Sequence, residues 1–356
     1  MADPRHPRDG FRPAPWLRGA HLQTIVPTLL PAPAMGTPDE EMLVEVAAGN
    51  RLRILIARPQ SRPRGTLVLV HGLGGSAASG YMIRTARMAL EAGWVAVRVN
   101  LRNCGGTERL ATTLYNAGQS EDVGRVLEEL KAARLPGPLA LVGFSLGGNL
   151  VLRYAGLAGA TCLAEAMVAV NPPVDLEACV RCLEEPRNSL YQAYFTWRLC
   201  RLLKRIRRVR KVPGPAPLPW RVGTVRRFDA CYTAPDGGYS SAEEYYGKAS
   251  AGPHLASLQV PTLLLSALDD PFVSREVFAP HQGTAGGRLH LVQPPFGGHV
   301  GYWQAGRPRF WAGRMALNWV EAALGAGNPS TPESYQEPRP HQGSPERTVR
   351  PRAFLS

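Results

Sequence analysis

Short apolar runs alternate with amphipathic stretches along most of the chain. Thr66–Val70 and Trp94–Asn100 are typical of strands buried on both faces, and Tyr81–Ala92 between them has the spacing of a helix. The pattern continues with predicted strands at Leu52–Ala57, Leu139–Val142, Ala164–Val170, Thr262–Ser266 and Arg288–Val292, and with predicted helices at Glu121–Arg134, Leu146–Gly156 and Phe310–Ala323. Such alternation implies an α/β fold with a mostly parallel central sheet flanked by helices. Functional residues are then expected at the carboxyl ends of the strands.

The pattern divides the chain into one large domain and two tails. Residues 16–325 form the predicted α/β domain, which an insertion at about 171–258 interrupts between two predicted strands. Residues 1–15 and 326–356 are rich in proline, serine, glycine and charge, with few large apolar residues, so burial would not offset their ordering entropy. Both are predicted to be mobile tails.

The chain is strongly basic. Its 356 residues include 41 Lys and Arg against 28 Asp and Glu, a net charge of +13, which favours contact with anionic surfaces or substrates. The N-terminal residues lack the apolar core of a signal peptide, and no stretch approaches about 18 uninterrupted apolar residues, the length of a membrane span. A cytoplasmic protein is therefore expected.

Six scattered cysteines do not have the density of a disulfide scaffold. Cys179 and Cys182 form a C-x-x-C motif, but no second pair or nearby histidine completes a zinc site. They are interpreted as partly buried helix residues. Neither a metal nor another cofactor is expected.

The sequence Gly143-Phe144-Ser145-Leu146-Gly147 joins a predicted strand to a predicted helix. This is the setting of a G-x-S-x-G nucleophile elbow, a sharp turn in which side chains at the two glycine positions would collide with backbone. The N–H of Leu146 at the helix start would donate to a developing oxyanion. A chance match in a chain with 37 glycines is the alternative, which the position between strand and helix disfavours. Ser145 is the candidate nucleophile.

A second oxyanion donor is expected from a glycine-rich loop after an earlier strand. His71-Gly72-Leu73-Gly74-Gly75-Ser76 follows the run Thr66–Val70, and the N–H of Leu73 is the candidate. The loop has neither the spacing of a P-loop nor that of a dinucleotide-binding turn, so nucleotide binding is not expected.

A serine nucleophile needs a base and an acid, in the chain order Ser, Asp, His. His299 lies in a glycine-rich loop just after the last predicted strand, which is the expected place for the base. Asp269 and Asp270 both follow the run Thr262–Ser266, and only one of them needs to orient the imidazole. Asp270 is favoured because the following proline fixes the turn, and Asp269 remains the alternative.

At this point the chain resembles the YheT-like and ABHD1/ABHD3-like branch of the α/β-hydrolase fold family, over roughly residues 14–320. The most specific segments are Leu17-Arg18-Gly19-Ala20-His21-Leu22-Gln23-Thr24, Arg102-Asn103-Cys104-Gly105-Gly106-Thr107, Gly118-Gln119-Ser120-Glu121-Asp122, Arg227-Phe228-Asp229, Tyr232-Thr233-Ala234-Pro235 and Gly238-Tyr239.

This resemblance implies carboxylic-ester hydrolysis with Ser145, Asp270 and His299 as the charge-relay residues. Family members can have another residue in place of the first aspartate of the pair, which also favours Asp270 as the acid. It further implies that the insertion at about 171–258 is a helical cap over the active site. Relatives have esterase, phospholipase or acyl-transfer roles, so the implied partner is a small-molecule ester or a lipid. One departure is Asn116, where many bacterial relatives have a histidine.

The insertion contains a basic amphipathic stretch. Arg198–Val212 places leucines, an isoleucine and a valine on one helical face and eight Lys or Arg around the rest. The main interpretation is a cap helix that packs its apolar face on the core, and the alternative is contact with an anionic membrane surface or phospholipid headgroups. Nucleic-acid binding is not expected, because no recognised motif accompanies the charge.

The leading hypothesis is a serine hydrolase that cleaves carboxylic esters through an acyl-enzyme on Ser145. An acyltransferase or a phospholipase would use the same residues. An acyltransferase differs from a hydrolase only in the second nucleophile. A non-catalytic binding module is disfavoured, because no member of the predicted triad is missing.

Overall fold

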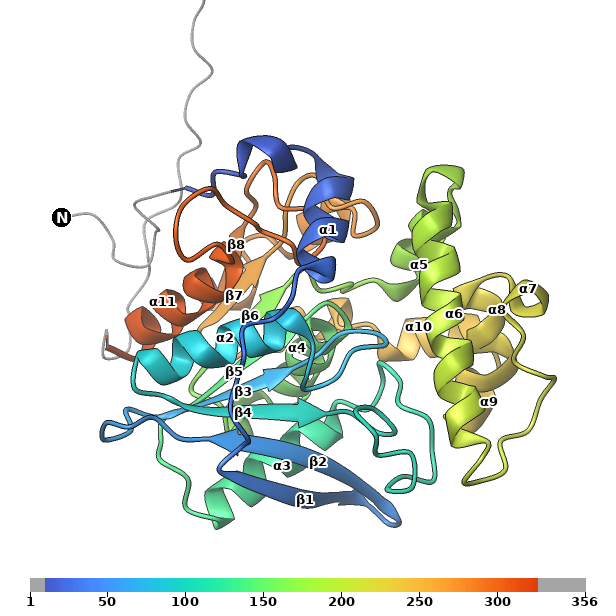
Figure 1. The fold of residues 1–356 in the computed structure, drawn as a ribbon, viewed down its shortest axis with the longest axis horizontal. Coiled ribbons are helices and arrows are strands. Elements are labelled where there is room, and N and C mark those ends of the chain that lie inside the picture. The colour runs from blue at the N-terminus through green and yellow to red at the C-terminus, as the bar shows by residue number, and fades with distance from the viewer. Residues whose placement is uncertain (1–9, 326–356) are drawn as a thin grey trace, which may run out of the picture.

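The computed structural model describes residues 10–325, which form one eight-stranded sheet with helices on both faces (Figure 1). The strands are β1 (Glu40–Ala47), β2 (Asn50–Ala57), β3 (Thr66–Val70), β4 (Val95–Asn100), β5 (Leu139–Phe144), β6 (Ala166–Val170), β7 (Thr262–Leu265) and β8 (Leu289–Val292). Their order is β1-β2-β4-β3-β5-β6-β7-β8. The pairs from β4 to β8 are parallel, and β2 pairs antiparallel with β1 and β4. The predicted mostly parallel sheet is confirmed.

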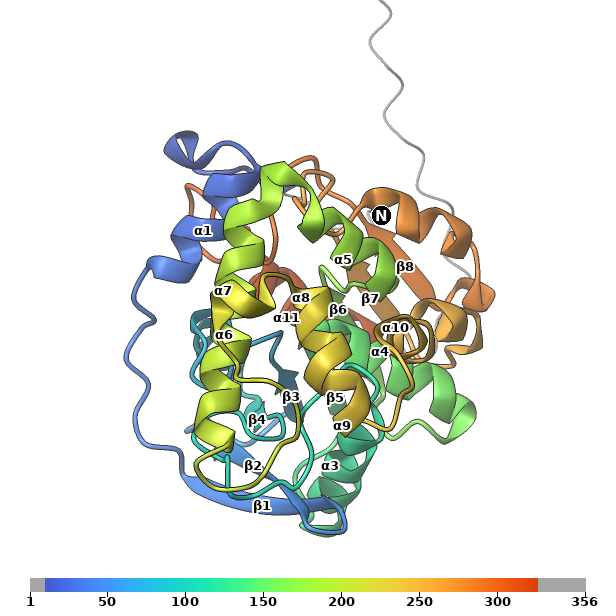
Figure 2. The ribbon, with the colours of Figure 1, turned by 90° about the vertical axis from the view of Figure 1, so that its right-hand side faces the viewer.

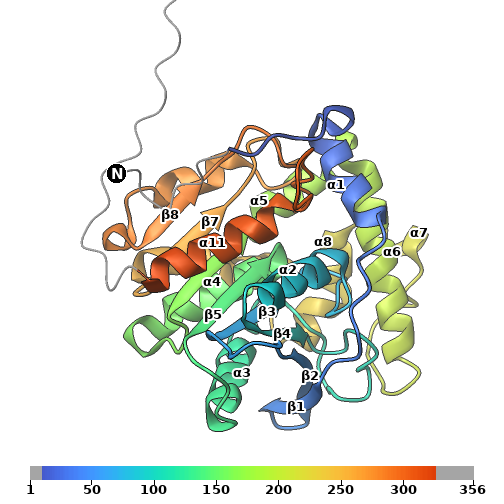
Figure 3. The same ribbon diagram turned by 60° about the vertical axis from the view of Figure 1, so that its left-hand side comes forward.

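Each face of the sheet has its own hydrophobic core. The covering helices are α2 (Gly80–Glu91) and α11 (Trp311–Gly325) on one face, and α3 (Glu121–Ala132) and α4 (Leu146–Ala158) on the other (Figure 3). Within β3, Leu67 and Leu69 belong to the first core, whereas Val68 and Val70 belong to the second. This alternation places side chains on both faces, so the whole strand is apolar.

Outside the insertion, one strand and one α-helix are absent from the sequence-based prediction. Strand β1 lies at the sheet edge, and among its side chains only Val44 and Val46 are buried, so its apolar signal is weak. Helix α1 (Ala20–Leu29) contains Pro27, a residue that normally argues against a helix interior.

The segment between β6 and β7 is helical and lies beyond the carboxyl ends of the central strands (Figures 1 and 2). Its α-helices are α5 (Leu176–Glu184), α6 (Ser189–Ile206), α7 (Pro219–Val222), α8 (Val225–Phe228), α9 (Ala234–Asp236) and α10 (Ala242–Ala249). A π-helical turn, η4 (Asp229–Thr233), joins α8 to α9. The part of the chain predicted as an insertion therefore stands over the sheet edge where functional residues are expected.

The predicted basic helix differs in its bounds from α6. The helix begins nine residues before Arg198 and ends at Ile206 rather than Val212. Its predicted apolar face is buried through Leu199, Leu202, Leu203 and Ile206, so the packing interpretation is confirmed for these residues.

Hydrogen bonds from Arg207 explain why α6 ends at Ile206 rather than at Val212. The Arg207 guanidinium donates to the carbonyls of Pro213, Gly214 and Pro215 at 2.8–3.0 Å, which holds the chain reversed after the helix.

The N-terminal residues that the structure describes lie against the fold. Phe11 is buried between Tyr302 and Trp311, and the Ala14 N–H donates to the Trp303 carbonyl at 3.1 Å. Residues 10–15 of the predicted N-terminal tail are thus held by aromatic packing, whereas residues 1–9 and the predicted tail 326–356 lie outside the described residues. Between residues 10 and 325 no helix combines the length and apolar character needed to cross a membrane.

Candidate active site

Ser145 lies in the sharp turn between β5 and α4. Its backbone has φ 53° and ψ −122°, a region that non-glycine residues rarely adopt. A Cβ on Gly143 would lie 2.3 Å from the Gly147 carbonyl oxygen, and a Cβ on Gly147 would lie 2.3 Å from the Val70 carbonyl oxygen. The turn therefore requires glycine at both positions, as the motif predicts. It directs the Ser145 side chain to the carboxyl edge of the sheet.

His299 and Asp270 are aligned with Ser145. His299 Nε2 is 2.8 Å from Ser145 Oγ, and His299 Nδ1 is 2.8 Å from Asp270 Oδ2. Asp270 follows β7 and His299 follows β8, so both lie at the edge of the sheet to which β5 delivers Ser145. The His299 ring packs on Phe272 with 4.1 Å between ring centroids. The three side chains selected from the sequence are thus within hydrogen-bonding distance in the order Ser, His, Asp.

The Asp270 carboxylate is fully buried and held by four hydrogen bonds. Oδ1 accepts the N–H groups of Phe272 and Val273 at 3.1 and 3.0 Å, and Oδ2 accepts from Asn171 at 2.6 Å in addition to His299. Bonds from backbone amides fix the carboxylate position, because those donors cannot rotate away. Asp270 therefore has one fixed orientation toward the imidazole.

Asn171 is a residue of this site that the sequence-based reasoning missed. It directly follows β6 with φ 47°, a left-handed conformation that asparagine tolerates. Its amide donates to Asp270 and to the Gly298 carbonyl, and its oxygen accepts the Val300 N–H at 3.3 Å. A polar residue at the carboxyl end of a buried strand is a signal that could have identified it.

The N-terminal helix α1 supports the His299 loop from outside. Thr24 Oγ1 accepts the His299 N–H at 2.9 Å. The Gln23 side chain accepts the Trp303 N–H at 2.7 Å and donates to the Trp303 carbonyl at 3.0 Å. Two residues of the family-like segment near the chain start therefore hold the loop that carries the histidine.

Two other family-like segments are joined by a buried ion pair. Arg102 donates to both carboxylate oxygens of Asp122, with Nε 2.7 Å from Oδ2, and both side chains are at most 9% exposed. A buried bidentate pair fixes the segment after β4 against the first turn of α3.

The loop after β3 leaves one backbone amide available. The Gly72 N–H donates to the Tyr81 hydroxyl at 3.0 Å and the Gly74 N–H donates to the Tyr115 hydroxyl at 2.8 Å. Between them, the Leu73 N–H has no hydrogen-bond partner within residues 10–325. Leu146 is the first residue of α4, so its N–H belongs to the donors that a helix start leaves unpaired. Leu146 directly follows Ser145, and Leu73 follows Gly72, where an added Cβ would lie 2.9 Å from Ser145 Cβ.

His71 anchors the base of this loop. Its Nε2 accepts the Leu101 N–H at 3.2 Å, so its Nδ1 carries the proton and donates to the Gly72 carbonyl at 2.8 Å. Burial lowers the pKa of His71 to about 4. A neutral imidazole therefore ties the loop after β3 to the end of β4 at neutral pH.

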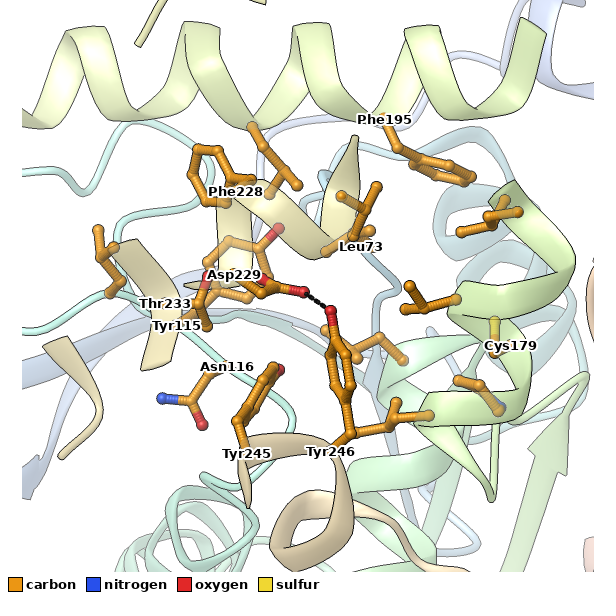
Figure 4. A pocket seen from close by; sticks show the side chains of 18 of the residues that line it. Leu73, Tyr115, Asn116, Cys179, Phe195, Phe228, Asp229, Thr233, Tyr245 and Tyr246 are labelled. Carbon is orange, nitrogen blue, oxygen red and sulfur yellow. Dashed lines mark hydrogen bonds between the residues drawn. The ribbon is translucent and has the colours of Figure 1, made fainter. Parts of the chain in front are cut away.

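Ser145 is one of the lining residues of a mostly apolar cavity. Phe195 of α6 and Phe228 of α8 also line it (Figure 4). The space between the lining atoms, counted out into open solvent, is about 830 Å³. Its walls near Ser145 are Leu73, Leu146 and Phe272, and the walls beneath the helical segment include Leu176, Val180, Leu183, Phe195, Leu199, Leu202, Leu203, Ile206, Val225 and Phe228. The lining near Ser145 and beneath the helical segment is predominantly apolar.

The cavity also has polar wall residues. Asp229 lies on the π-helical turn η4, and its Oδ2 accepts the Tyr246 hydroxyl at 2.8 Å (Figure 4). Asn116, Thr233 and Tyr245 also line this cavity. Burial raises the pKa of Asp229 to about 6. The spacing of residues within the insertion did not predict this polar group.

Cys179 and Cys182 lie on α5 and are half-buried, as predicted. Cys179 lines the apolar cavity, and burial raises the pKa of its thiol. Among residues 10–325 no group of three or more His, Cys, Asp or Glu could hold a metal ion.

Comparison with known proteins agrees with this architecture. The model of the alpha/beta hydrolase family matches residues 67–314. YheT of Escherichia coli (strain K12), which carries an esterase name, is 32% identical over 328 residues, covering 89% of this chain and 94% of YheT. Human phospholipase ABHD3 is 26% identical over 268 residues, covering 74% of this chain and 66% of the phospholipase.

Solved structures share the fold at low sequence identity. The Pyrococcus furiosus esterase Pf2001 aligns with a TM-score of 0.56 and 16% identity, over 82% of this chain and 97% of the esterase. The 2,6-dihydroxy-pseudo-oxynicotine hydrolase aligns with a TM-score of 0.54 and 17% identity, over 86% and 72% of the two chains. The α/β-hydrolase fold and the YheT-like and ABHD3-like resemblance inferred from the sequence are therefore confirmed, and the chain belongs to the alpha/beta hydrolase family.

Proposed function

We propose that the protein is a hydrolase that cleaves carboxylic esters through an acyl-enzyme on Ser145. The observation that carries the proposal is the continuous hydrogen-bonded line from Ser145 Oγ through His299 to Asp270, with 2.8 Å at each step. The esterase and phospholipase names of its relatives support hydrolysis of an ester or lipid. The apolar cavity at Ser145 supports an acyl chain as the bound group.

In the proposed first step, Ser145 Oγ attacks the ester carbonyl carbon while His299 Nε2 takes the hydroxyl proton. Asp270 accepts a hydrogen bond from the Nδ1–H of His299 and stabilises the imidazolium that forms. The Leu73 and Leu146 amides would donate to the oxyanion of the tetrahedral intermediate. Collapse of the intermediate breaks the ester bond, and the leaving alcohol takes the proton from His299.

In the second step, His299 takes a proton from water as the water oxygen attacks the acyl-enzyme. The carboxylic acid is released, and Ser145 regains its proton from His299. An alcohol in place of water would give acyl transfer instead. Hydrolysis is preferred here because the relatives carry esterase and phospholipase names.

Labelling with a fluorophosphonate together with hydrolysis of p-nitrophenyl esters of increasing acyl length tests the proposal. We expect labelling and turnover in the wild type, and a fall in kcat of about 10⁴-fold or more with no labelling in Ser145→Ala. Ser61→Ala, at an exposed serine away from the site, is the matched control. Unchanged turnover in Ser145→Ala would overturn the assignment.

A further inference from the structure

The cavity that Ser145 lines has a polar wall formed by Tyr115, Asp229, Tyr245 and Tyr246 (Figure 4). These four residues come from three separate parts of the chain: the segment after β4, the π-helical turn η4 and helix α10. Each is at most 8% exposed. Because buried polar groups cost free energy unless they are hydrogen-bonded, the partners of this wall have to be accounted for.

The Asp229 carboxylate has acceptor capacity left. Its Oδ2 accepts the Tyr246 hydroxyl at 2.8 Å, and the Thr233 side chain also bonds to the carboxylate. A carboxylate offers about four acceptor positions. Within residues 10–325 no cation forms an ion pair with Asp229, since Arg226, whose charge acts on it, pairs with three glutamates instead. Asp229 can therefore accept a further hydrogen bond from a bound molecule.

Two tyrosines of the wall have hydroxyl protons without an acceptor. The Tyr245 hydroxyl accepts the Ala117 N–H at 2.9 Å, and the Tyr115 hydroxyl accepts the Gly74 N–H at 2.8 Å. Neither hydroxyl donates to another group in the part of the chain that the structure describes. Burial raises the pKa of both hydroxyls, and the charge of Asp229 adds to this rise, so both lie near the carboxylate.

The polar wall lies in the same cavity as the candidate nucleophile. Ser145 and Leu146 line this cavity, and so does Leu73. Leu73 precedes Gly74, whose N–H the Tyr115 hydroxyl accepts. An acyl group joined to Ser145 would therefore share one cavity with unpaired donors and an unpaired acceptor.

A hydroxyl group matches these unpaired groups. It can donate to Asp229 and accept from Tyr245 or Tyr115 at the same time. An ammonium group only donates, so it would leave the tyrosine protons unpaired, and a phosphate or carboxylate would be repelled by the charge of Asp229.

We propose that the ester cleaved at Ser145 carries a hydroxyl group on its acyl chain, and that Asp229 and Tyr245 bind this hydroxyl. The inference rests on the proposed function, because it names the substrate class of the same site. The acyl chain is the part concerned because it stays joined to Ser145 after the alcohol has left. The apolar lining would hold the methylene groups between the ester carbonyl and the hydroxyl. Asp229 and Tyr245 then determine specificity and take no part in the chemical step.

Esters that differ only in this hydroxyl provide the test. The p-nitrophenyl esters of hexanoate, octanoate, decanoate and dodecanoate are compared with their ω-hydroxy counterparts, so the leaving group is constant. We expect kcat/KM to favour the hydroxylated ester about tenfold at one or two neighbouring chain lengths. At the other lengths the plain ester should be favoured, because a hydroxyl among apolar side chains loses its hydrogen bonds.

Two variants of the wall locate the preference. Asp229→Asn and Tyr245→Phe are each expected to lower the ratio of the two kcat/KM values about fivefold at the preferred length. Tyr239→Phe is the matched control, because the Tyr239 ring lies 5.2 Å from that of Tyr245 but does not line the cavity, and it should leave the ratio unchanged. The ratio compares two substrates in one preparation, so partial unfolding does not alter it. If Tyr245→Phe fails to fold, Asp229→Asn carries the test.

The outcomes separate this inference from the proposed function. A preference for the plain ester at every length, or a hydroxyl preference that survives in both variants, would overturn the inference while hydrolysis dependent on Ser145 upholds the proposed function. A stronger preference for ω-amino esters would assign the wall to a cation and also overturn it. A preference seen only for 2-hydroxyethyl octanoate over ethyl octanoate would place the hydroxyl on the alcohol part, again against the inference. Failure of the wild type to hydrolyse any of these esters would overturn both.

Discussion

Asp269 and Asp270 are neighbours in the chain, but only Asp270 contacts the imidazole of His299. The Asp270 carboxylate points to His299 Nδ1 at 2.8 Å, whereas Asp269 Oδ1 accepts the Gly298 N–H at 2.8 Å. Asp269 therefore holds the backbone of the loop, and Asp270 contacts the ring. The two carboxylates that the sequence left as alternatives thus have different structural roles.

Replacement of each aspartate by asparagine should separate these roles. Asp270→Asn is expected to lower kcat by about 10³- to 10⁴-fold, because an amide at Nδ1 favours the wrong imidazole tautomer. Asp269→Asn should lower kcat by about tenfold or less, since it still offers an oxygen to Gly298. Both kcat values are measured with one p-nitrophenyl ester. A larger loss in Asp269→Asn would assign the acid to that residue.

Asn171 is predicted to act as a positioning residue through Asp270. Asn171→Gly removes the bond to the Asp270 carboxylate but keeps the left-handed backbone, so we expect kcat to fall roughly 10- to 100-fold with little change in KM. Asn171→Ala should add about 1 kcal/mol of destabilisation, because alanine is strained at φ 47°. Steady-state kinetics and urea unfolding measure the two effects. An unchanged kcat in Asn171→Gly would contradict this role.

Local patterns predicted the sheet and the residues at its edge. Runs such as Thr66–Val70 are long, apolar and bounded by turns, and the positions of Ser145, Asp270 and His299 follow from the strands that precede them. Asn171 required knowledge of which strands are neighbours, because its partner is 99 residues away along the chain. The polar group at Asp229 depends on the packing of short helices whose sequence has no clear period.

Replacing a glycine by alanine is predicted to have opposite effects on stability at the elbow and on α10. Gly147→Ala should destabilise the protein by about 3 kcal/mol or prevent folding, because its Cβ would lie 2.3 Å from the Val70 carbonyl oxygen. Gly247→Ala, on α10 with no atom within 4 Å of the added Cβ, should stabilise the fold by up to about 1 kcal/mol. Thermal unfolding compares them. Equal melting temperatures for the two variants would argue against a sterically required glycine at the elbow.

Two basic residues after α6 are predicted to differ in how much they stabilise the fold. Arg210 pairs with Asp236 at 3.3 Å, and these side chains are 17% and 11% exposed, so Arg210→Gln should cost about 1–3 kcal/mol. Arg208 is exposed, and Arg208→Gln should change stability by about 0.5 kcal/mol or less. Urea unfolding measures both. Equal losses of stability in the two variants would show that the Arg210–Asp236 ion pair does not stabilise this segment. Arg208 is the better position for testing contact with anionic vesicles.

We predict that replacing Asp229 stabilises the fold by an amount that depends on pH. Burial raises its pKa from 3.8 to about 6, so the folded state binds a proton more readily than the unfolded state. Above about pH 6 the buried carboxylate is charged and destabilises the fold, although Arg226 offsets part of this cost. As the pH falls through 6 toward 4, the folded state takes up the proton and the cost disappears.

Asp229→Asn removes this titration and keeps an oxygen for the Tyr246 hydroxyl. Its stability relative to the wild type should therefore be about 2 kcal/mol more favourable near pH 8 than near pH 4. His71 titrates in the opposite direction, because its pKa is lowered to about 4, but it does so in both proteins and cancels from the difference. Urea unfolding across this range measures the difference. A difference that does not depend on pH would mean that Asp229 ionises in the folded protein as it does in the unfolded chain.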